Sequence, residues 1–161
     1  MKSEDGFTLI ELLITVALIG ILGAIAVMST PQMLNNYRVK GAARQVYSDM
    51  QMARLRAIKE GKRFAVEFTS ATAYCVKSEV NTVTTLPDDF TNGCTTANDT
   101  ILNNIDIAAD YSGVTSSCTN TRVVFNPNGT AGGCGSSFTI SKDLKTQTIS
   151  INTGTGNIRM N

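Results

Sequence analysis

The sequence contains no histidine and no tryptophan. Without histidine, a Ser/His/Asp catalytic triad cannot form. The cysteines do not form a Cys-x-x-Cys pair, and neither a phosphate-binding glycine loop nor an EF-hand spacing occurs, so no zinc, redox, nucleotide or calcium site is predicted. Asp88 and Asp89 are adjacent acids in a polar stretch, which is typical of a solvated turn. We therefore predict a protein that is not an enzyme and that binds no cofactor or metal.

Lysine and arginine are absent from a long apolar segment, Phe7 to Met28. A helix needs about 20 apolar residues to cross the hydrocarbon core of a bilayer. A buried helix of a soluble core is one alternative, but such runs are usually shorter. A cleaved secretory signal is another, but it would have a basic amino-terminal region and a shorter apolar stretch. We therefore predict a retained membrane helix over residues 7–28.

Glu11 is the one charged residue inside this segment. A charge in the middle of a membrane helix costs about 2.5–3.5 kcal/mol, and less near an end. A carboxylate in such a place is by default functional and has a partner, yet no base lies nearby in the sequence. The alternative is that Glu11 lies among the lipid head groups and interacts favourably with the positive end of the helix dipole.

The stretch Gly6-Phe7-Thr8-Leu9-Ile10-Glu11-Leu12 resembles the processing motif of type IV pilins and of type II secretion pseudopilins. The resemblance implies that residues 1–6 are a leader, that prepilin peptidase cleaves after Gly6, and that the new amino terminus of Phe7 is methylated. It also implies that Glu11 meets the terminal amine of another subunit during assembly. In a low-dielectric setting this pair would set the register, because any other register leaves a buried charge unpaired.

An amphipathic helix is predicted over residues 29–61 as a continuation of the apolar one, with a kink or brief interruption at Pro31. Apolar residues recur there every three or four positions, at Val39, Ala43, Val46, Met50, Ala53 and Ala57. Gly61 is a natural stop. From Phe7 to Glu60 the helix would be about 80 Å long. Its first half would serve as a membrane or filament core, and its second half would support a globular head.

The apolar period changes to two beyond Gly61, which predicts antiparallel strands that are buried on one face. The clearest lie at 64–68, 123–125, 138–140 and 149–151, and weaker ones at 74–80 and 101–107. Residues 81–100 are polar and predict a long loop, while 126–129 and 132–135 predict turns. The predicted fold is therefore α+β: a long amino-terminal helix packed on an antiparallel β head over residues 62–161.

Four cysteines, Cys75, Cys94, Cys118 and Cys134, all follow the apolar segment. An even number at scattered spacings is typical of two disulfides formed in an oxidising compartment. Four cysteines allow three pairings, and the sequence alone does not choose among them. We favour Cys75–Cys94 and Cys118–Cys134, because these pairs close short polar loops.

The head has a second family likeness. The helix end "AARQVYSDMQMARLRAIKEG", the stretch Phe125-Asn126-Pro127-Asn128-Gly129 and the closing Gly156-Asn157-Ile158-Arg159 are similar to GspH/FimT-type minor pilins and pseudopilins. The likeness implies a minor pilin of a type IV pilus that helps to prime or cap the fibre. A minor pseudopilin of type II secretion is the alternative. Either would sit first in the bacterial inner membrane with its head in the periplasm, and then join other pilins in a fibre.

A DNA receptor is the alternative from another class. DNA-uptake members of the family carry Gly-Arg-x-Arg near the carboxyl terminus, but here the first arginine is replaced by Asn157. Lys142, Lys145 and Arg159 could form a basic edge that binds phosphates weakly and without sequence preference. No aromatic residue after Phe138 could stack on bases. The other interpretation is that these are solvated charges that resist edge-to-edge strand pairing.

Overall fold

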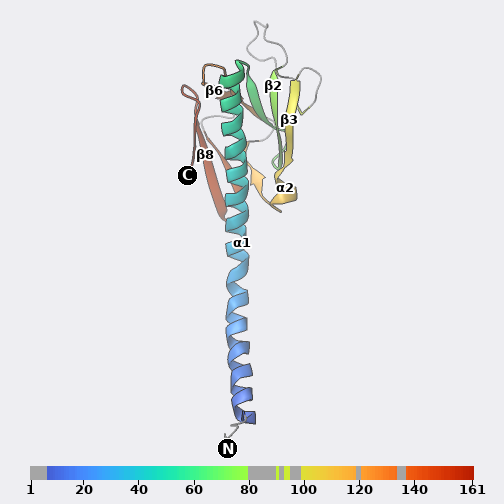
Figure 1. Cartoon of the computed structure of the whole chain (residues 1–161), viewed down its shortest axis with the longest axis vertical. Coiled ribbons are helices and arrows are strands. Elements are labelled where there is room, and N and C mark those ends of the chain that lie inside the picture. The colour runs from blue at the N-terminus through green and yellow to red at the C-terminus, as the bar shows by residue number, and fades with distance from the viewer. Residues whose placement is uncertain (1–6, 80–89, 91–92, 95–98, 119–120, 134–136) are drawn as a thin grey trace, which may run out of the picture. The chain divides into compact units, whose positions relative to one another are not determined.

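The computed structural model describes residues 7–79, 90, 93–94, 99–118, 121–133 and 137–161, and only the backbone of residues 26–31 (Figure 1). The chain divides into two compact units, residues 1–34 and residues 35–161. One helix, α1 (Leu9–Glu60), contributes to both units. It passes through Pro31 without a break, so a brief interruption is wrong, and the alternative that we gave, a kink, stays a prediction. A proline removes one backbone hydrogen bond, and the flanking turns of a long helix keep theirs.

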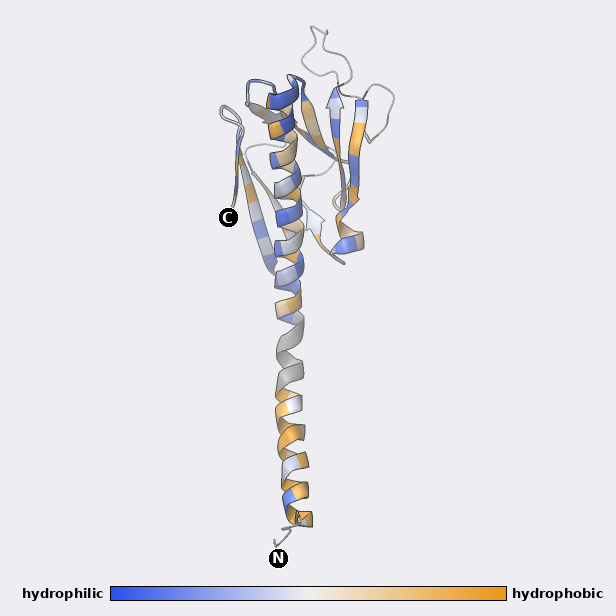
Figure 2. Cartoon of the chain, viewed as in Figure 1, coloured by the Kyte–Doolittle hydropathy of each residue, from blue (hydrophilic) through white to orange (hydrophobic). Residues whose placement is uncertain are grey.

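The first unit is helical from Leu9 onward, and its described side chains, residues 7–25 and 32–34, are all exposed. Most of them are large and apolar (Figure 2). A helix with apolar residues all around is covered by something other than water in its working state.

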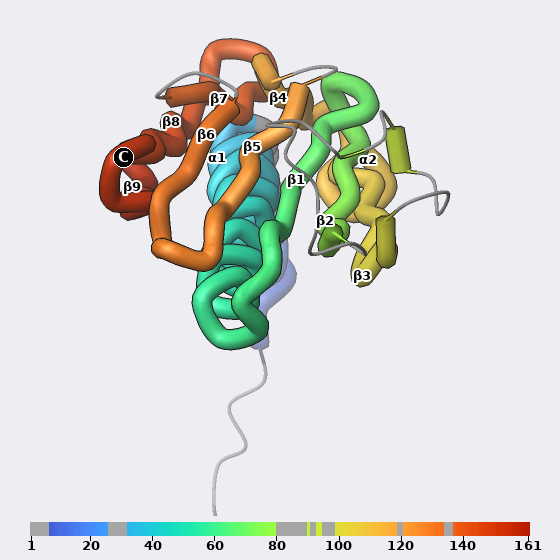
Figure 3. Tube along the Cα trace, turned by 90° about the horizontal axis from the view of Figure 1, so that it is seen from above, coloured from blue at the N-terminus to red at the C-terminus, as the bar shows by residue number. Residues whose placement is uncertain are grey.

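The second unit contains two antiparallel sheets that lie around the carboxyl-terminal half of α1 (Figure 3). Sheet A has the order β3-β2-β1-β5-β6. Its strands are β1 (Phe64–Phe68), β2 (Ala73–Glu79), β3 (Asp99–Asp106), β5 (Thr121–Phe125) and β6 (Ala131–Gly133). Sheet B has the order β4-β7-β8-β9. Its strands are β4 (Thr115–Ser116), β7 (Ser137–Lys142), β8 (Lys145–Asn152) and β9 (Asn157–Met160). The α+β prediction is confirmed.

The core of this unit is the predicted apolar stripe of α1 together with the facing residues of both sheets. Val39, Ala42, Ala43, Val46, Met50, Ala53 and Ala57 are at most 2% exposed. Four of these seven are alanines, which let the strands approach the helix axis closely. Phe68 of β1 and Phe138 of β7 join the sheets edge to face, with ring centroids 5.3 Å apart. Gly61, at φ +66°, ends the helix as predicted.

Strand β1 differs from the prediction, because it is buried on both faces. Phe64, Val66 and Phe68 point to the core, but Ala65 and Glu67 on the other face are also buried. The described residues Phe90 and Gly93 contact that outer face, since Gly93 donates its N–H to Glu67 and Phe90 accepts a hydrogen bond from Arg122. Alternation along one strand cannot show that a later segment covers its polar side.

Three smaller differences concern local structure. A short helix, α2 (Ile107–Asp110), was not predicted; Asp106 caps it by accepting a hydrogen bond from the Ala108 N–H. The predicted turn at 132–135 is partly wrong, because Gly132 and Gly133 belong to β6, and the rest lies outside the described residues. The third difference is that strand β3 begins at Asp99, two residues before the predicted start.

The turn at 126–129 is confirmed, with the Gly129 N–H donating to the Asn126 carbonyl.

Tyr74 links sheet A to α1 and generates a prediction about alkaline stability. Its hydroxyl donates to Asp49 Oδ2 at 2.6 Å. Burial, and then the hydrogen bond and charge of Asp49, raise the pKa of Tyr74 above its ordinary value of 10.0. Above pH 10 the unfolded state loses a proton that the folded state keeps. The free energy of unfolding should therefore fall with rising pH, by about 1.4 kcal/mol per pH unit for this group.

Tyr74→Phe should be less stable than the wild type near neutral pH, because Asp49 loses its donor. It should also lose stability less steeply above pH 10. Denaturant unfolding at a series of pH values measures both effects, with Tyr37→Phe, which removes an exposed hydroxyl, as the matched control. Equal alkaline slopes for Tyr74→Phe and the wild type would contradict the prediction.

Candidate functional site

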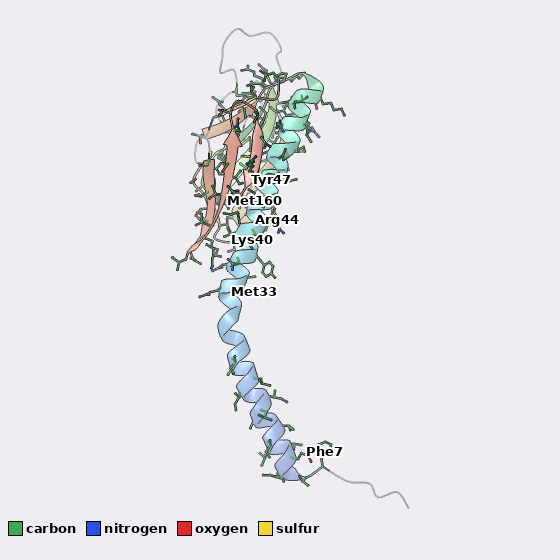
Figure 4. The ribbon with its side chains drawn as sticks, turned by 90° about the vertical axis from the view of Figure 1, so that its left-hand side faces the viewer. Phe7, Met33, Lys40, Arg44, Tyr47 and Met160 are labelled. Atoms are coloured by element: carbon green, nitrogen blue, oxygen red, sulfur yellow. A yellow bond between two sulfur atoms is a disulfide. The ribbon has the colours of Figure 1, made fainter. Side chains whose placement is uncertain are left out.

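The amino-terminal end of α1 carries the residues of the predicted processing and assembly motif. Phe7 lies at this end and is 82% exposed (Figure 4). Thr8 caps the helix: the N–H of Glu11 donates to Thr8 Oγ1 at 3.3 Å and to the Thr8 carbonyl at 3.2 Å. Gly6 lies outside the described residues. The Thr-x-x-Glu spacing is the signature of a capping box, and sequence reasoning missed it although the signal was present.

Glu11 is exposed and lies on the first turn of α1. Within the described residues no salt bridge involves its carboxylate, since every ion pair found there belongs to the second unit. The negative charge of Glu11 is favoured at this end of the helix dipole. The geometry thus leaves the carboxylate accessible for a cation from outside the described chain.

In the part of the chain that the structure describes, no helix has both the length and the apolar character required to span a bilayer. The membrane helix predicted over residues 7–28 therefore stays a prediction.

A cluster of charged side chains lies on the outer face of sheet A, on three neighbouring strands. We call Glu67 of β1, Lys77 of β2 and Asp99 of β3 the Lys77 cluster. Lys77 Nζ lies 2.6 Å from Glu67 Oε2 and 3.1 Å from Asp99 Oδ2. The side chains of Lys77 and Asp99 are completely buried, and that of Glu67 is 8% exposed. Burial of this kind is rare for charged residues and requires pairing.

The described residues of the segment after β2 close this cluster from outside. The Phe90 ring faces three cations, with its centroid 5.5 Å from Lys77 Nζ and 5.6 Å and 6.0 Å from the guanidinium carbons of Arg63 and Arg122. Lys77 also donates to the Gly93 carbonyl at 3.2 Å. Arg63 binds Glu79 through two hydrogen bonds of 2.9 Å and 2.5 Å. The cluster is therefore a shielded polar site.

The predicted disulfide Cys75–Cys94 is present and anchors this segment to β2. Cys118 is also disulfide-bonded. Cys134, the partner that we predicted for Cys118, lies outside the described residues, so that pairing stays a prediction.

The three residues of the predicted basic edge do not come together. Lys142 and Lys145 are paired at the end of the β7–β8 hairpin, whereas Arg159 of β9 pairs with Ser150. Lys145 and Ser150 are five positions apart on β8, which is about 17 Å along a strand. The two ends also lie on opposite faces, because Lys145 shares the buried face of Ile149 and Ser150 does not. The pairing register therefore places Arg159 apart from Lys142 and Lys145, and DNA binding by these residues stays a prediction.

Each part of that predicted edge has different surroundings. Lys142 donates a hydrogen bond to the Ser112 carbonyl and is thus engaged within the head. Arg159 lines a hollow of about 650 Å³ on the outer face of sheet B, together with Ser137, Ser150, Ile151, Asn152, Thr155 and Asn157. Arg159 is the one cationic residue that lines this hollow, and no aromatic ring lines it. The hollow therefore provides one phosphate contact and no stacking surface for a nucleic-acid strand.

The two head stretches with a family likeness meet at one junction between the sheets. The turn after β5 and the turn after β8 are joined by the Ala131 N–H, which donates to the Thr153 carbonyl at 2.9 Å. Arg54 of α1 donates to the Thr155 carbonyl at 2.9 Å. Gly156 has φ +61°, and a Cβ there would overlap the carbonyl oxygen of Gly129. Only glycine fits this position.

Gly156→Ala should lower the free energy of unfolding by about 1–3 kcal/mol, because it combines a positive φ with a backbone clash. Gly154→Ala is the matched control on the same turn, since its nearest neighbour is the Asn152 side chain at 3.6 Å. The control should change stability by less than about 0.5 kcal/mol. Equal effects of the two substitutions in denaturant unfolding would contradict this account of the junction.

Comparisons with known proteins match both parts of the chain. The family profile described as type II transport protein GspH matches residues 42–155. The profile of the prokaryotic N-terminal methylation motif matches residues 1–27. Two proteins of Pseudomonas aeruginosa, each named fimbrial protein, are 44% identical to this chain over 69 residues, or 43% of this chain. These matches span 44% of the length of each relative.

Solved structures match the fold. Two crystal forms of the type IV minor pilin FimU of Pseudomonas aeruginosa give TM-scores of 0.52 and 0.50 at 16% identity. The matches cover 76% of this chain and 87% and 91% of the FimU chains. At this identity the likeness shows a shared fold alone.

Proposed function

This chain belongs to the GspH family, and we propose that it is a minor pilin of a type IV pilus. In this proposal it is a structural subunit and not an enzyme. Prepilin peptidase cleaves it between Gly6 and Phe7, Phe7 is methylated, and the subunit enters a fibre through α1. The observation that carries the proposal is the exposed apolar surface of residues 7–25, which lies within the match to the methylation motif.

The apolar surface supports assembly because it is too extensive to remain in water. Twelve large apolar side chains from Phe7 to Ile25 are more than half exposed. They are Phe7, Leu9, Ile10, Leu12, Leu13, Ile14, Val16, Leu18, Ile19, Ile21, Leu22 and Ile25. Burial yields about 25 cal/mol for each Å² of apolar surface. We infer that lipid covers this surface first, in a single-pass inner-membrane state, and that neighbouring pilins cover it in the fibre.

Glu11 supplies the specificity that an apolar surface lacks. Cleavage after Gly6 would give each subunit an ammonium group on Phe7. The carboxylate of Glu11, which has no ion pair within the described residues, would then meet the amine of a neighbouring subunit. Such a pair in low dielectric favours one register, because misregistered subunits leave both charges unpaired.

The disulfides support placement of the head outside the cytoplasm. Cys75–Cys94 and the bonded Cys118 need an oxidising compartment in order to persist. This fits a head that faces the periplasm before assembly and the fibre surface afterwards.

A minor pseudopilin of type II secretion is the second candidate, and the description of the matching family favours it. Both candidates use the same processing and the same helix. Deletion of the gene separates them: loss of surface fibres supports the pilus, and loss of secreted proteins with normal fibres supports the pseudopilus. The third alternative, a DNA receptor, gains no support, because Arg159 lies apart from Lys142 and Lys145.

Glu11→Leu tests the assembly proposal. The variant should reach the membrane at or above the wild-type level, because a charge disappears from an apolar segment. Its amount in sheared fibres should fall roughly tenfold or more, since an unpaired buried charge costs about 3–5 kcal/mol. Immunoblots of the membrane and fibre fractions measure both quantities.

Thr15→Leu is the matched control. It removes a polar group from the same half of α1, where the Thr15 hydroxyl donates to the Leu12 carbonyl of its own helix, and it leaves the charge of Glu11 in place. Its amount in fibres should stay at the wild-type level. Wild-type amounts of Glu11→Leu in the fibre fraction would refute the role of Glu11.

A further inference from the structure

The Lys77 cluster has the composition and geometry of a site for covalent bond formation. We propose that Lys77 and Asp99 become joined by an intramolecular isopeptide bond, and that Glu67 is the base that moves the proton. The bond would link β2 to β3 covalently on the outer face of sheet A. This inference does not depend on the proposed function, because it concerns chemistry within the head.

The three side chains come from three adjacent strands and point to the same face. Lys77 belongs to the central strand β2, with Asp99 on β3 to one side and Glu67 on β1 to the other. A register shift occurs between Val76 and Lys77, so the β2–β3 ladder is irregular at this residue. Such bulges re-aim a side chain. As a result Nζ lies 2.6 Å from one carboxylate and 3.1 Å from the other.

Burial makes condensation favourable. The Lys77 and Asp99 side chains have no solvent exposure. An ion pair in such a place gains little, because the desolvation of two charges offsets their attraction. An amide between the two residues removes both charges from the interior. Condensation also releases water, and the Phe90 ring and the Cys75–Cys94 disulfide shield the site from water that would reverse it.

The surroundings distinguish the roles of the two carboxylates. Glu67 accepts the Gly93 N–H at 2.6 Å through Oε1 and faces Arg122 at 4.0 Å through Oε2. These contacts hold the Glu67 carboxylate beside Nζ, where it can receive the proton that the nitrogen releases. Arg122 is also the residue paired with Glu67 across β1 and β5, so this arrangement is fixed by the sheet. The Asp99 carboxylate lies 3.1 Å from Lys77 Nζ through Oδ2, and it is the acyl group in the proposal.

The step balances without any cofactor. A proton passes from the Lys77 ammonium to Asp99, which gives an uncharged amine beside an uncharged acid. The lone pair of Nζ forms a bond to Cγ of Asp99. Glu67 takes a proton from the nitrogen and delivers it to the hydroxyl of the tetrahedral intermediate. The C–O bond then breaks, and one water molecule leaves. Fixed reactants of this kind reach effective molarities of about 10⁵–10⁸ M.

The bond would reinforce the same part of the head as the disulfide. Cys75–Cys94 already holds the segment after β2 to the sheet. A Lys77–Asp99 bond would add a second covalent link, between a residue that follows Cys75 on β2 and a residue that follows Cys94 at the start of β3. Unlike the disulfide, an amide survives reducing conditions. A subunit carrying both links would keep β2 and β3 paired under pulling force.

The mass of the full-length chain tests the proposal. The protein is exported to an oxidising compartment, purified, reduced and measured intact, and its amino terminus is read from a peptide map, so that the state of the leader does not matter. The mass should be lower than the sequence requires by one water molecule. Proteolysis should yield a branched peptide that joins residues 77 and 99. A folded wild type with two linear peptides and no loss of water would overturn the proposal.

Three variants test the roles of the residues, with formation of the Cys75–Cys94 disulfide as the criterion of folding. Asp99→Ala should keep its full mass, because it has no acyl group, and loss of water from this variant would also overturn the proposal. Asp99→Asn should lose ammonia and reach the same final mass as the wild type, since both give the same amide. Glu67→Gln should fold with little or no bond, and a wild-type yield would show that Glu67 is not the base.

Discussion

The stripe of small and apolar residues on α1 is the contact on which the second unit depends. Ala42, Ala43, Ala53 and Ala57 let strands approach the helix, while Val46 and Met50 fill the space between them. The edge-to-face contact of Phe68 and Phe138 then sets the two sheets against each other over this stripe. Once the inner faces are fixed in this way, strand alternation decides which residues of each sheet point outward. The positions of the Lys77 cluster and of Arg159 follow from that contact.

The two halves of α1 differ in how their apolar side chains are covered, although they share one continuous helix. Beyond Asn35 one face of the helix is buried within its own chain, whereas the described side chains of residues 7–25 are exposed and mostly apolar. The same helix therefore contributes to a folded head and presents an apolar surface that the described residues of its own chain leave exposed. Glu11 and its cap at Thr8 place the one charge of that surface beside the site where processing would create a cation.

The sequence was sufficient to predict those features of the structure that depend on one local pattern of residues. The period of α1, the stop at Gly61, the core-facing residues of β1 and the disulfide Cys75–Cys94 were all predicted correctly. It was insufficient where distant segments meet. Glu67 was predicted to face solvent because nothing in β1 indicates that Phe90 and Gly93 cover it. Arg159 was grouped with Lys145 because neither their separation along β8 nor their opposite faces can be read without the pairing register. The Thr8–Glu11 cap was readable and was missed.

We propose that this chain is processed and then assembled through the apolar half of α1. The most direct measurement is mass spectrometry of its amino-terminal peptide from sheared, purified fibres of the native cell. We expect a peptide that begins at Phe7 and carries a methylated amine. A chain in fibres that still begins at Met1, or one found in the membrane but never in fibres or a secretion pseudopilus, would contradict it.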